Sequence, residues 1–262
     1  MPTHSKVLLC ADLDRTILPN GPQEESPQAR PLLCALAARP EVTLVYVSGR
    51  HKSLLLEAIG EYDIPVPDYA IGDVGTTIYD IVNDQWHAWE AWSKEIAPDW
   101  DRMPHDGLAK MLADIDILQL QESEKQNTFK LSYYAPEDTD RDVLLARIKR
   151  RLDPHGIRAS LIWSIDEIKH LGLLDVLPGC ATKLHAIQFL MQQKGFDEAH
   201  TVFAGDSGND LPVLTSGLQA ILVGNSRVEV REEAQRRVEA AGWPESLYIA
   251  CGGFLGMNGN YA

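Results

Sequence analysis

The sequence is poor in cysteine, and the cysteines that it has are widely separated. Four occur among 262 residues, and no two of them form a CxxC pair. This spacing matches neither a zinc site nor a disulfide framework, so we expect free thiols in a reducing cytoplasm. The four residues are Cys10, Cys34, Cys180 and Cys251.

Basic residues and long apolar runs are also scarce. The chain has 24 lysines and arginines against 38 aspartates and glutamates, which gives a formal net charge of -14. So acidic a chain offers no basic face to a phosphate backbone, and we do not expect nucleic-acid binding. No apolar run reaches the length of a membrane span, and none resembles the core of a signal peptide. We therefore expect a cytoplasmic protein with no membrane partner.

The chain is rich enough in apolar residues to build a buried core. Hydrophobic residues make up 45% of the sequence, and 262 residues can fold as two modest domains. The first apolar stretch, Val7 to Ala11, ends in Asp12 and Asp14. It predicts a buried parallel strand whose carboxyl end opens into a polar site, with Leu13 turned into the core. Two carboxylates so close need a proton or a cation between them, unless they form only a solvated strand exit.

A second predicted strand, residues 42–47, ends in Ser48, Gly49 and Arg50. A hydroxyl, a glycine and a cation before a helix suit an anion, because the free N–H groups of the helix point at the same place. The alternative is that Ser48 is a plain helix cap.

The same pattern returns near the C-terminus. A helix from about residue 183 to 193 carries Lys183 in its first turn, where a cation opposes the helix dipole. The alternative for this residue is an ordinary surface lysine. The next strand, residues 201–204, ends in Gly205-Asp206-Ser207-Gly208-Asn209-Asp210. Strands that alternate with helices in this way predict an α/β fold with a doubly wound, Rossmann-like parallel sheet.

The segment between these halves follows another pattern. Helices are predicted at residues 99–117 and 140–152, and strands at 128–134 and 157–165. Trp86, Trp89 and Trp92 fall three apart, as on one face of a helix. We interpret residues 84–170 as an inserted α+β domain, and residues 1–83 and 171–262 as the core.

Four motifs carry a family resemblance. They are Asp-Leu-Asp-Arg-Thr at 12–16, Ser-Gly-Arg at 48–50, Lys183, and Gly-Asp-Ser-Gly-Asn-Asp at 205–210. In this order they resemble the haloacid dehalogenase superfamily of Mg²⁺-dependent phosphatases. The insertion between the second and third motifs resembles the class IIB cap of that superfamily. More narrowly, the first motif, Lys-Leu-Ser-Tyr at 130–133 and Asp-Val-Leu-Pro at 175–178 resemble sucrose-phosphate phosphatases.

The resemblance implies a chemistry for the site. Asp12 would be the nucleophile of an aspartyl-phosphate intermediate, and Asp14 would protonate the leaving sugar oxygen and then activate water. The expected Mg²⁺ ligands are Asp12, the backbone carbonyl of Asp14, Asp206 and Asp210. The expected phosphate ligands are Ser48, Gly49, Lys183 and Asn209.

Selectivity would then come from the insertion, folded over the core as a lid, because metal and phosphate contacts are the same for every ester. The candidate sugar-binding residues are Gln126, Asn127, Lys130 and Ser132, unless they form an ordinary polar strand face. The resemblance favours sucrose 6-phosphate, with mannosylfructose phosphate and glucosylglycerol phosphate as alternatives. It also implies a monomer and association with a sucrose-phosphate synthase. A phosphomutase of the same fold and a receiver-like phosphoaspartate signalling module are the remaining alternatives.

Overall fold

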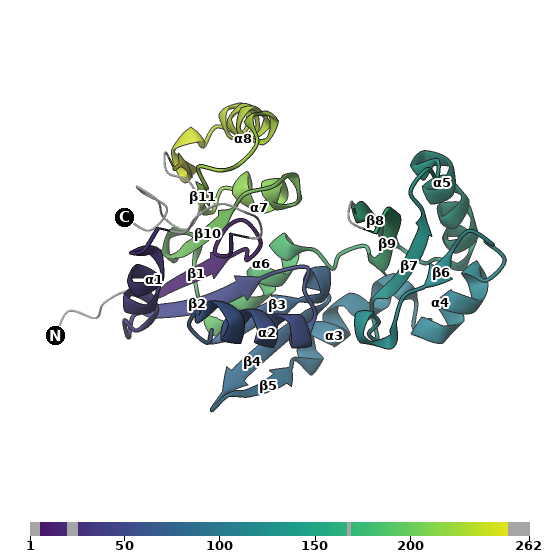
Figure 1. Cartoon of the computed structure of the whole chain (residues 1–262), viewed down its shortest axis with the longest axis horizontal. Helices are drawn as coiled ribbons and strands as arrows, with labels where there is room; N and C mark the ends of the chain where they lie inside the picture. Colours follow the sequence, from purple (N-terminus) through teal and green to yellow (C-terminus); the bar gives the residue numbers. More distant parts are fainter. Residues whose placement is uncertain (1–5, 20–25, 167–168, 251–262) are drawn as a thin grey trace. The chain divides into compact units, whose positions relative to one another are not determined.

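The structure is a computed structural model, and it describes residues 6–19, 26–166 and 169–250. It divides into two compact units, which are described separately (Figure 1). We call residues 1–88 and 183–262 the core unit, and residues 89–182 the inserted unit.

The core unit is built on one mostly parallel sheet. Its eight strands follow the order β12-β11-β10-β1-β2-β3-β4-β5. The strands are β1 (Val7–Ala11), β2 (Val42–Val47), β3 (Tyr69–Gly72), β4 (Thr77–Val82), β5 (Gln85–Ala88), β10 (Thr201–Gly205), β11 (Gln219–Leu222) and β12 (Leu247–Ile249). The six strands from β12 to β3 run parallel, and β4 and β5 add an antiparallel hairpin at the edge. The predicted α/β fold with a doubly wound sheet is confirmed.

The helices of the core unit are α1 (Ala29–Ala37), α2 (Lys52–Tyr62), α6 (Lys183–Lys194), α7 (Leu211–Leu214) and α8 (Val228–Ala241). Four of them, α1, α2, α7 and α8, connect neighbouring parallel strands, and α6 leads from the inserted unit into β10. From β1 the chain moves one way through β2 and β3, and from β10 it moves the other way through β11 and β12. Right-handed crossovers in opposite directions place α1 and α2 on one face of the sheet, and α7 and α8 on the other. The reversal lies at β1 and β10, where sheets of this kind bind ligands.

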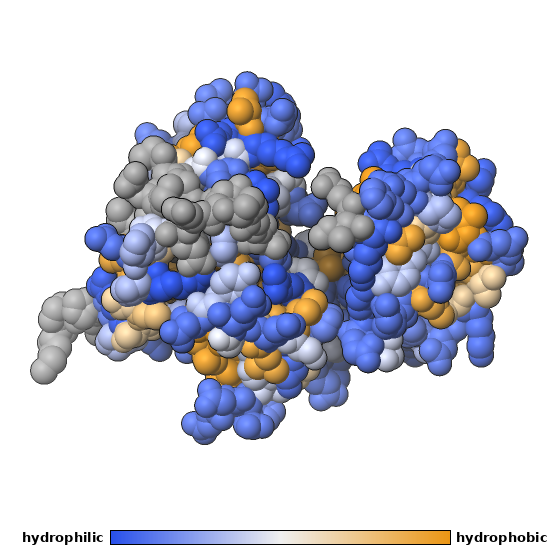
Figure 2. Space-filling model, in the orientation of Figure 1, coloured by the Kyte–Doolittle hydropathy of each residue, from blue (hydrophilic) through white to orange (hydrophobic). Residues whose placement is uncertain are grey.

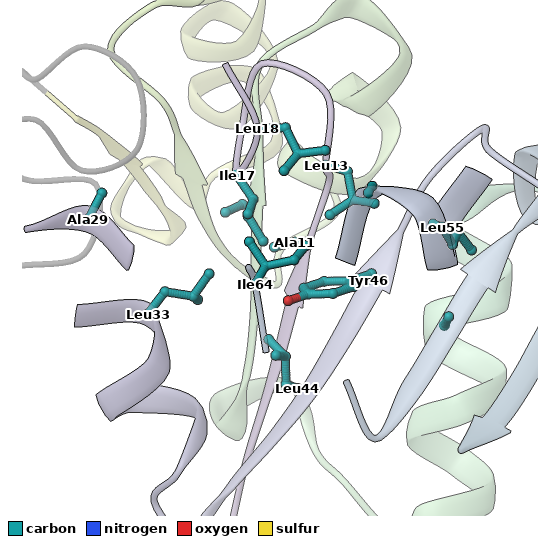
Figure 3. Packing of buried hydrophobic residues seen from close by; sticks show 13 residues of the cluster. Ala11, Leu13, Ile17, Leu18, Ala29, Leu33, Leu44, Tyr46, Leu55 and Ile64 are labelled. Carbon is teal, nitrogen blue, oxygen red and sulfur yellow. The ribbon is translucent and has the colours of Figure 1, made fainter. Parts of the chain in front are cut away.

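Apolar side chains beneath α1 and α2 hold the first motif in place (Figure 3). Leu13 is fully buried and belongs to the same cluster as Leu44, Tyr46 and Leu55. The chain that carries Asp12 is therefore anchored by the residue that follows it, because moving Leu13 would open a cavity in a close-packed interior. The predicted inward orientation of Leu13 is confirmed.

The inserted unit is a small antiparallel sheet with helices on one face. Its strands follow the order β6-β7-β9-β8. They are β6 (Gln119–Leu120), β7 (Leu131–Pro136), β8 (Ala159–Asp166) and β9 (Leu171–Pro178). The helices are α3 (Glu90–Ile96), α4 (His105–Leu112) and α5 (Arg141–Leu152).

The register of this sheet separates an apolar face from a polar one. Side chains alternate along each strand, so residues that are paired across strands share a face. One face packs on α4 and α5 through Leu131, Tyr133, Leu161, Trp163, Leu174 and Val176. The opposite face presents Ser132, Tyr134, Ser160, Ile162, Leu173 and Asp175. The inserted unit thus has its own core and one sheet face without helices from that core.

Two expectations about the insertion differ from the structure. Residues 171–178 were expected in the core, but β9 pairs with β7 and β8 on either side within the inserted unit. Residues 85–88 were expected in the insertion, but β5 pairs with β4 in the core sheet. The unit boundaries therefore lie at 88/89 and 182/183 and not at 83/84 and 170/171.

The predictions of a tryptophan face on one helix and of a single helix at residues 99–117 were also wrong. Trp86 lies on β5 and packs edge-on against Tyr79 with ring centroids 5.5 Å apart, whereas only Trp92 lies in α3. Residues 99–117 contain a 3-10 turn and the shorter helix α4, because Asp101 and Arg102 adopt left-handed backbone conformations between them. A left-handed pair ends a helix.

The face of the molecule drawn in Figure 2 is mostly hydrophilic, as the acidic composition leads us to expect. Among the described residues, we find no helix with the length and hydropathy needed to cross a bilayer. Cys10, Cys34 and Cys180 form no disulfide with one another, and Cys251 lies outside the described residues.

Candidate active site

The candidate active site lies where three neighbouring strands of the core sheet end. In the register of the sheet, Ala11 at the end of β1 lies beside Ala204 of β10 and Tyr46 of β2. The polar residues that follow the three strands are Asp12, Ser48 and Asp206. The carboxyl ends of parallel strands thus bring the three motifs to one edge of the sheet.

Asp12, Asp206 and Asp210 form a cluster of buried carboxylates. One oxygen from each lies within 4.8 Å of the others. The three residues are 6%, 6% and 0% exposed, so Asp12 does not lie at a solvated strand exit. Like charges in a buried site repel one another, and the cluster therefore needs cations beside it.

Lys183 supplies one of these cations. Its ammonium lies 3.0 Å from Asp12 Oδ1 and 2.7 Å from Asp210 Oδ1. The side chain is only 14% exposed, so the surface-lysine alternative is wrong. Lys183 is the first residue of α6, where the helix dipole opposes its charge. The two carboxylates compensate for that unfavourable position.

Asp210 is fixed by the loop that follows β10. Its Oδ2 accepts hydrogen bonds from the backbone N–H of Asp206 at 3.2 Å and of Ser207 at 3.1 Å. The hydroxyl of Ser207 donates to the same oxygen at 3.0 Å. A Cβ on Gly205 would lie 2.8 Å from Asp210 Cγ, closer than real Cβ contacts come. The glycine at the end of β10 is therefore needed for the Asp210 carboxylate to occupy this position.

Burial changes the protonation of the cluster. It raises the pKa of Asp12 to about 7 against the opposing effect of Lys183. It also raises the pKa of Asp206 to about 6, with the charge of Asp210 adding to the shift. Burial alone would lower the pKa of Lys183, but its two carboxylate partners raise it. Protons and a metal ion would therefore compete for these oxygens near neutral pH.

The cluster has the ligand chemistry that a hard divalent cation requires. Mg²⁺ prefers carboxylate and carbonyl oxygens and keeps several of its water ligands. Asp12, Asp206 and Asp210 offer three such oxygens close together, and the group contains no nitrogen or sulfur ligand. The residues present therefore fit an oxygen-ligated metal ion.

Two arginines contact the acids of the site, and sequence reasoning predicted neither contact. Arg50 donates to both carboxylate oxygens of Asp14, at 2.6 and 3.1 Å. Arg15 Nε donates to Asp206 Oδ2 at 3.1 Å. Both arginines belong to the motifs at 12–16 and 48–50, so the signal was present. Sequence alone could not show that Arg50 would pair with the acid Asp14.

In the loop after β2, the backbone N–H of Ser48 donates to the carbonyl of Ile71 at 2.8 Å. Ser48 is fully buried, and its Oγ accepts the N–H of Arg50 at 3.2 Å. The N-cap of α2 is His51, so the alternative that Ser48 caps this helix is wrong. Gly49 and Asn209, the other two candidate phosphate ligands, are exposed.

The candidate sugar-binding residues form a network inside the inserted unit. Lys130 Nζ lies 2.6 Å from Ser132 Oγ and 3.1 Å from Asp175 Oδ1. Ser132 donates its hydroxyl proton to Asp175 at 2.5 Å. Lys130 and Ser132 are 7% and 0% exposed, so they are not an ordinary exposed strand face.

Gln126 and Asn127 support this network from the segment before β7. Gln126 donates to the carbonyl of Ser132 and accepts its N–H, both at 2.8 Å. Asn127 Oδ1 accepts the N–H of Phe129 at 2.8 Å. The two amides thus fix the shape of the segment. Asp175 also belongs to the network, although sequence reasoning did not include it among the candidate sugar-binding residues.

Comparison with known proteins identifies the relatives of this chain. The family model described as sucrose-6F-phosphate phosphohydrolase matches residues 5–253. A putative HAD-like hydrolase of Nitrosococcus oceani is 61% identical over 257 residues, which are 98% of this chain and 69% of that protein. Sucrose-phosphatase 1 of Nicotiana tabacum is 27% identical over 234 residues, which are 86% of this chain and 52% of that protein. The chain thus spans about half the length of the tobacco enzyme.

A solved structure shares the fold. The sucrose-phosphatase of Synechocystis sp., determined in complex with sucrose and phosphate, aligns with a TM-score of 0.73 and 24% identity. The alignment covers 97% of this chain and 95% of that protein. Both units of the present chain therefore have counterparts in one known architecture.

Proposed function

The chain belongs to the sucrose-6F-phosphate phosphohydrolase family of haloacid dehalogenase-like phosphatases, and from this premise we propose that its substrate is sucrose 6-phosphate. It is a phosphoric monoester hydrolase. The observation that carries the proposal is the buried group of Asp12, Asp206 and Asp210 with Lys183 between them. Such a group supplies a nucleophile, metal ligands and a phosphate-binding cation at the end of one strand pair.

In the proposed reaction Asp12 attacks the phosphorus atom. The bond from phosphorus to the sugar oxygen breaks, and the leaving oxygen takes a proton from Asp14. Asp14 then takes a proton from water, which attacks the aspartyl phosphate and releases inorganic phosphate and free Asp12. Mg²⁺ held by Asp12, Asp206, Asp210 and the Asp14 carbonyl would supply positive charge against the phosphate oxygens.

Four residues are proposed to hold the phosphate group. Lys183 supports this role by its position, since its ammonium already lies beside Asp12 Oδ1. Ser48 and Gly49 follow β2 and would donate through the hydroxyl and the backbone N–H. Asn209 is exposed on the loop after β10 and would add a side-chain donor.

We further propose that the inserted unit recognises the sugar. A sugar presents hydroxyl groups, and a site that pairs them rejects analogues without them because its own polar groups are then unsatisfied. Lys130, Ser132 and Asp175 supply a cation, a hydroxyl and a carboxylate on the sheet face that carries no helices of the unit's core. Gln126 and Asn127 would act by fixing this group.

A panel of phosphate esters tests the proposal and its alternatives. Release of inorganic phosphate is measured from sucrose 6-phosphate, mannosylfructose phosphate, glucosylglycerol phosphate and monosaccharide phosphates, with Mg²⁺ present. Fastest release from sucrose 6-phosphate supports the proposal. Fastest release from another disaccharide or glycosyl phosphate assigns that substrate, and best hydrolysis of monosaccharide phosphates rejects the disaccharide class. Conversion to an isomer without phosphate release identifies a phosphomutase.

The physical state and partner of the protein are further parts of the proposal. A monomer that associates with a sucrose-phosphate synthase would receive its substrate directly from the enzyme that makes it. Sedimentation of the protein alone and in a mixture with such a synthase tests both statements. A single boundary at the dimer mass rejects the monomer. A boundary that does not shift in the mixture rejects the association with the synthase.

A further inference from the structure

Arg15 occupies an unusual backbone position beside the carboxylate cluster. Its φ angle is 64°, in the left-handed region that costs a residue with a side chain about 1 kcal/mol. The side chain points its guanidinium at the cluster, where Nε donates to Asp206 Oδ2 at 3.1 Å. The Arg15 side chain is 40% exposed, whereas that of Asp206 is 7% exposed. A half-exposed cation is thus paired with a buried carboxylate.

Asn225 holds Arg15 from the loop after β11. Its side-chain amide donates to the backbone carbonyl of Arg15 at 2.7 Å. In the other direction, the guanidinium Nη2 of Arg15 reaches the backbone carbonyl of Asn225 at 3.5 Å. The backbone N–H of Arg15 donates to the carbonyl of Leu18 at 2.8 Å. These contacts fix both ends of the residue and hold its charge at Asp206.

The two cations of the cluster divide the three acids between them. Lys183 pairs with Asp12 and Asp210, and Arg15 pairs with Asp206. When all five groups are ionised, one negative charge remains in excess. A divalent cation would change this to one positive charge, which favours a phosphate dianion. Without Arg15 the same metal-loaded group would be neutral.

We propose that Arg15 is a positioning residue that acts as a fixed counter-charge to Asp206, weakening the binding of the divalent metal ion and strengthening the binding of phosphate. The inference rests on the proposed metal site. Its physical basis is that one fixed charge repels a cation and attracts an anion at the same place. Opposite effects on two ligands are the signature of charge. A purely structural role would loosen the loop and weaken both.

Titration calorimetry on the full chain separates these cases. Mg²⁺ alone is titrated first, and inorganic phosphate is then titrated into protein that is saturated with Mg²⁺. In Arg15→Gln we expect Mg²⁺ to bind about tenfold more tightly and phosphate several-fold more weakly, the scale of one unit charge a few ångströms away. Arg15→Lys, which keeps the charge, should change both constants by less. Salt at 1 M should reduce the differences, since it screens charges beyond about 3 Å.

Two further variants serve as a second test and as a control. Arg15→Gly suits the left-handed backbone and removes the same charge, so it should reproduce Arg15→Gln even if the glutamine variant folds poorly. Arg236→Gln is the matched control. Arg236 pairs with Glu233 on α8, and this substitution removes one positive charge from the surface, away from the cluster. It should leave both constants unchanged.

Several outcomes overturn the inference. Weaker or unchanged Mg²⁺ binding in both Arg15→Gln and Arg15→Gly rejects the counter-charge, and parallel weakening of both ligands assigns Arg15 a structural role. Failure of the unaltered protein to bind Mg²⁺ is a different result. It rejects the metal site of the proposed function itself.

Discussion

Arg50, after β2, donates two hydrogen bonds to the carboxylate of Asp14, after the neighbouring strand β1, at 2.6 and 3.1 Å. A forked donor on both oxygens fixes the plane of the carboxylate as well as its position. The residue proposed as the acid is thus held in one orientation by the second motif. To protonate the leaving sugar oxygen, the Asp14 carboxyl group would have to leave Arg50 and turn toward that oxygen.

We expect Asp14→Asn to reduce hydrolysis of a sugar phosphate at least about 100-fold, because a sugar alkoxide leaves poorly without a proton donor. An aryl phosphate has a good leaving group and should be affected much less. Phosphate release from the two esters measures the difference. The matched control, Asp142→Asn, changes an exposed acid on α5 and should behave like the unaltered protein. Equal losses on both esters would remove Asp14 from the acid role.

The raised pKa values of two acids predict how pH affects metal binding. Asp12 and Asp206 have pKa values of about 7 and about 6 in the metal-free protein. The metal ion needs both ionised, so its dissociation constant should rise as the pH falls from 8 to 6. Calorimetric titration with Mg²⁺ at several pH values checks this. A dissociation constant that does not change over this range would contradict the protonation of the cluster.

The same shifts predict the stability of the metal-free protein. The folded state holds protons on Asp12 and Asp206 that the unfolded state releases at its ordinary aspartate pKa of 3.8. Between about pH 4 and 7 the folded state therefore binds more protons, so the free energy of unfolding should fall as pH rises. Urea unfolding in a chelator measures the trend for this pair, with Asp12→Asn as the comparison. The variant should lose much of the pH dependence, and an unchanged slope would show that other groups produce it.

Steric contact at the end of β10 gives a matched pair of glycine variants. A Cβ on Gly205 would press on Asp210 at 2.8 Å, whereas one on Gly208 meets nothing within 4 Å. Gly205→Ala should therefore displace Asp210 and weaken Mg²⁺ binding about tenfold or more, the usual size of a disturbed ligand shell. Gly208→Ala should bind Mg²⁺ as the unaltered protein does. Similar affinities in the two variants would separate Asp210 from the metal site.

The network of the inserted unit predicts a substrate-dependent effect. Lys130→Met keeps much of the side-chain volume but removes the cation beside Ser132 and Asp175. Hydrolysis of sucrose 6-phosphate should become strongly slower, while that of a small aryl phosphate should hardly change. The aryl ester also serves as the control for folding of the core unit. Equal loss on both esters, or loss on neither, would reject the assignment to sugar recognition.

Much of the core site could be predicted from sequence, because an apolar run followed by polar residues indicates where a buried strand ends. The apolar strand before Asp12 and the one before Asp206 are adjacent and parallel, so their carboxyl ends had to meet. Leu13 followed from the alternation of side chains at a strand end. Lys183 was noted because a cation in the first turn of a helix opposes the helix dipole, an unfavourable placement that indicated a functional reason.

The rest depended on contacts between distant segments. Arg15 and Arg50 belong to motifs, but their partners depend on proximity in three dimensions, and no spacing rule predicts them. Residues 171–178 were assigned to the core, yet which sheet this strand joins is decided by its neighbours β7 and β8. Trp86 shows a similar limit, since a spacing of three fits a helix until strand pairing with β4 overrides it.

The central claim is that Asp12 carries the reaction with a divalent metal ion. The most direct measurement is phosphate release from sucrose 6-phosphate by the unaltered protein and by Asp12→Asn, each with Mg²⁺ and with a chelator. Asparagine keeps the shape of the side chain but is not a nucleophile, so the variant should fold and release no phosphate. Only the unaltered protein with Mg²⁺ should be active. Substantial Mg²⁺-dependent release by Asp12→Asn, or full activity in the chelator, would contradict the account.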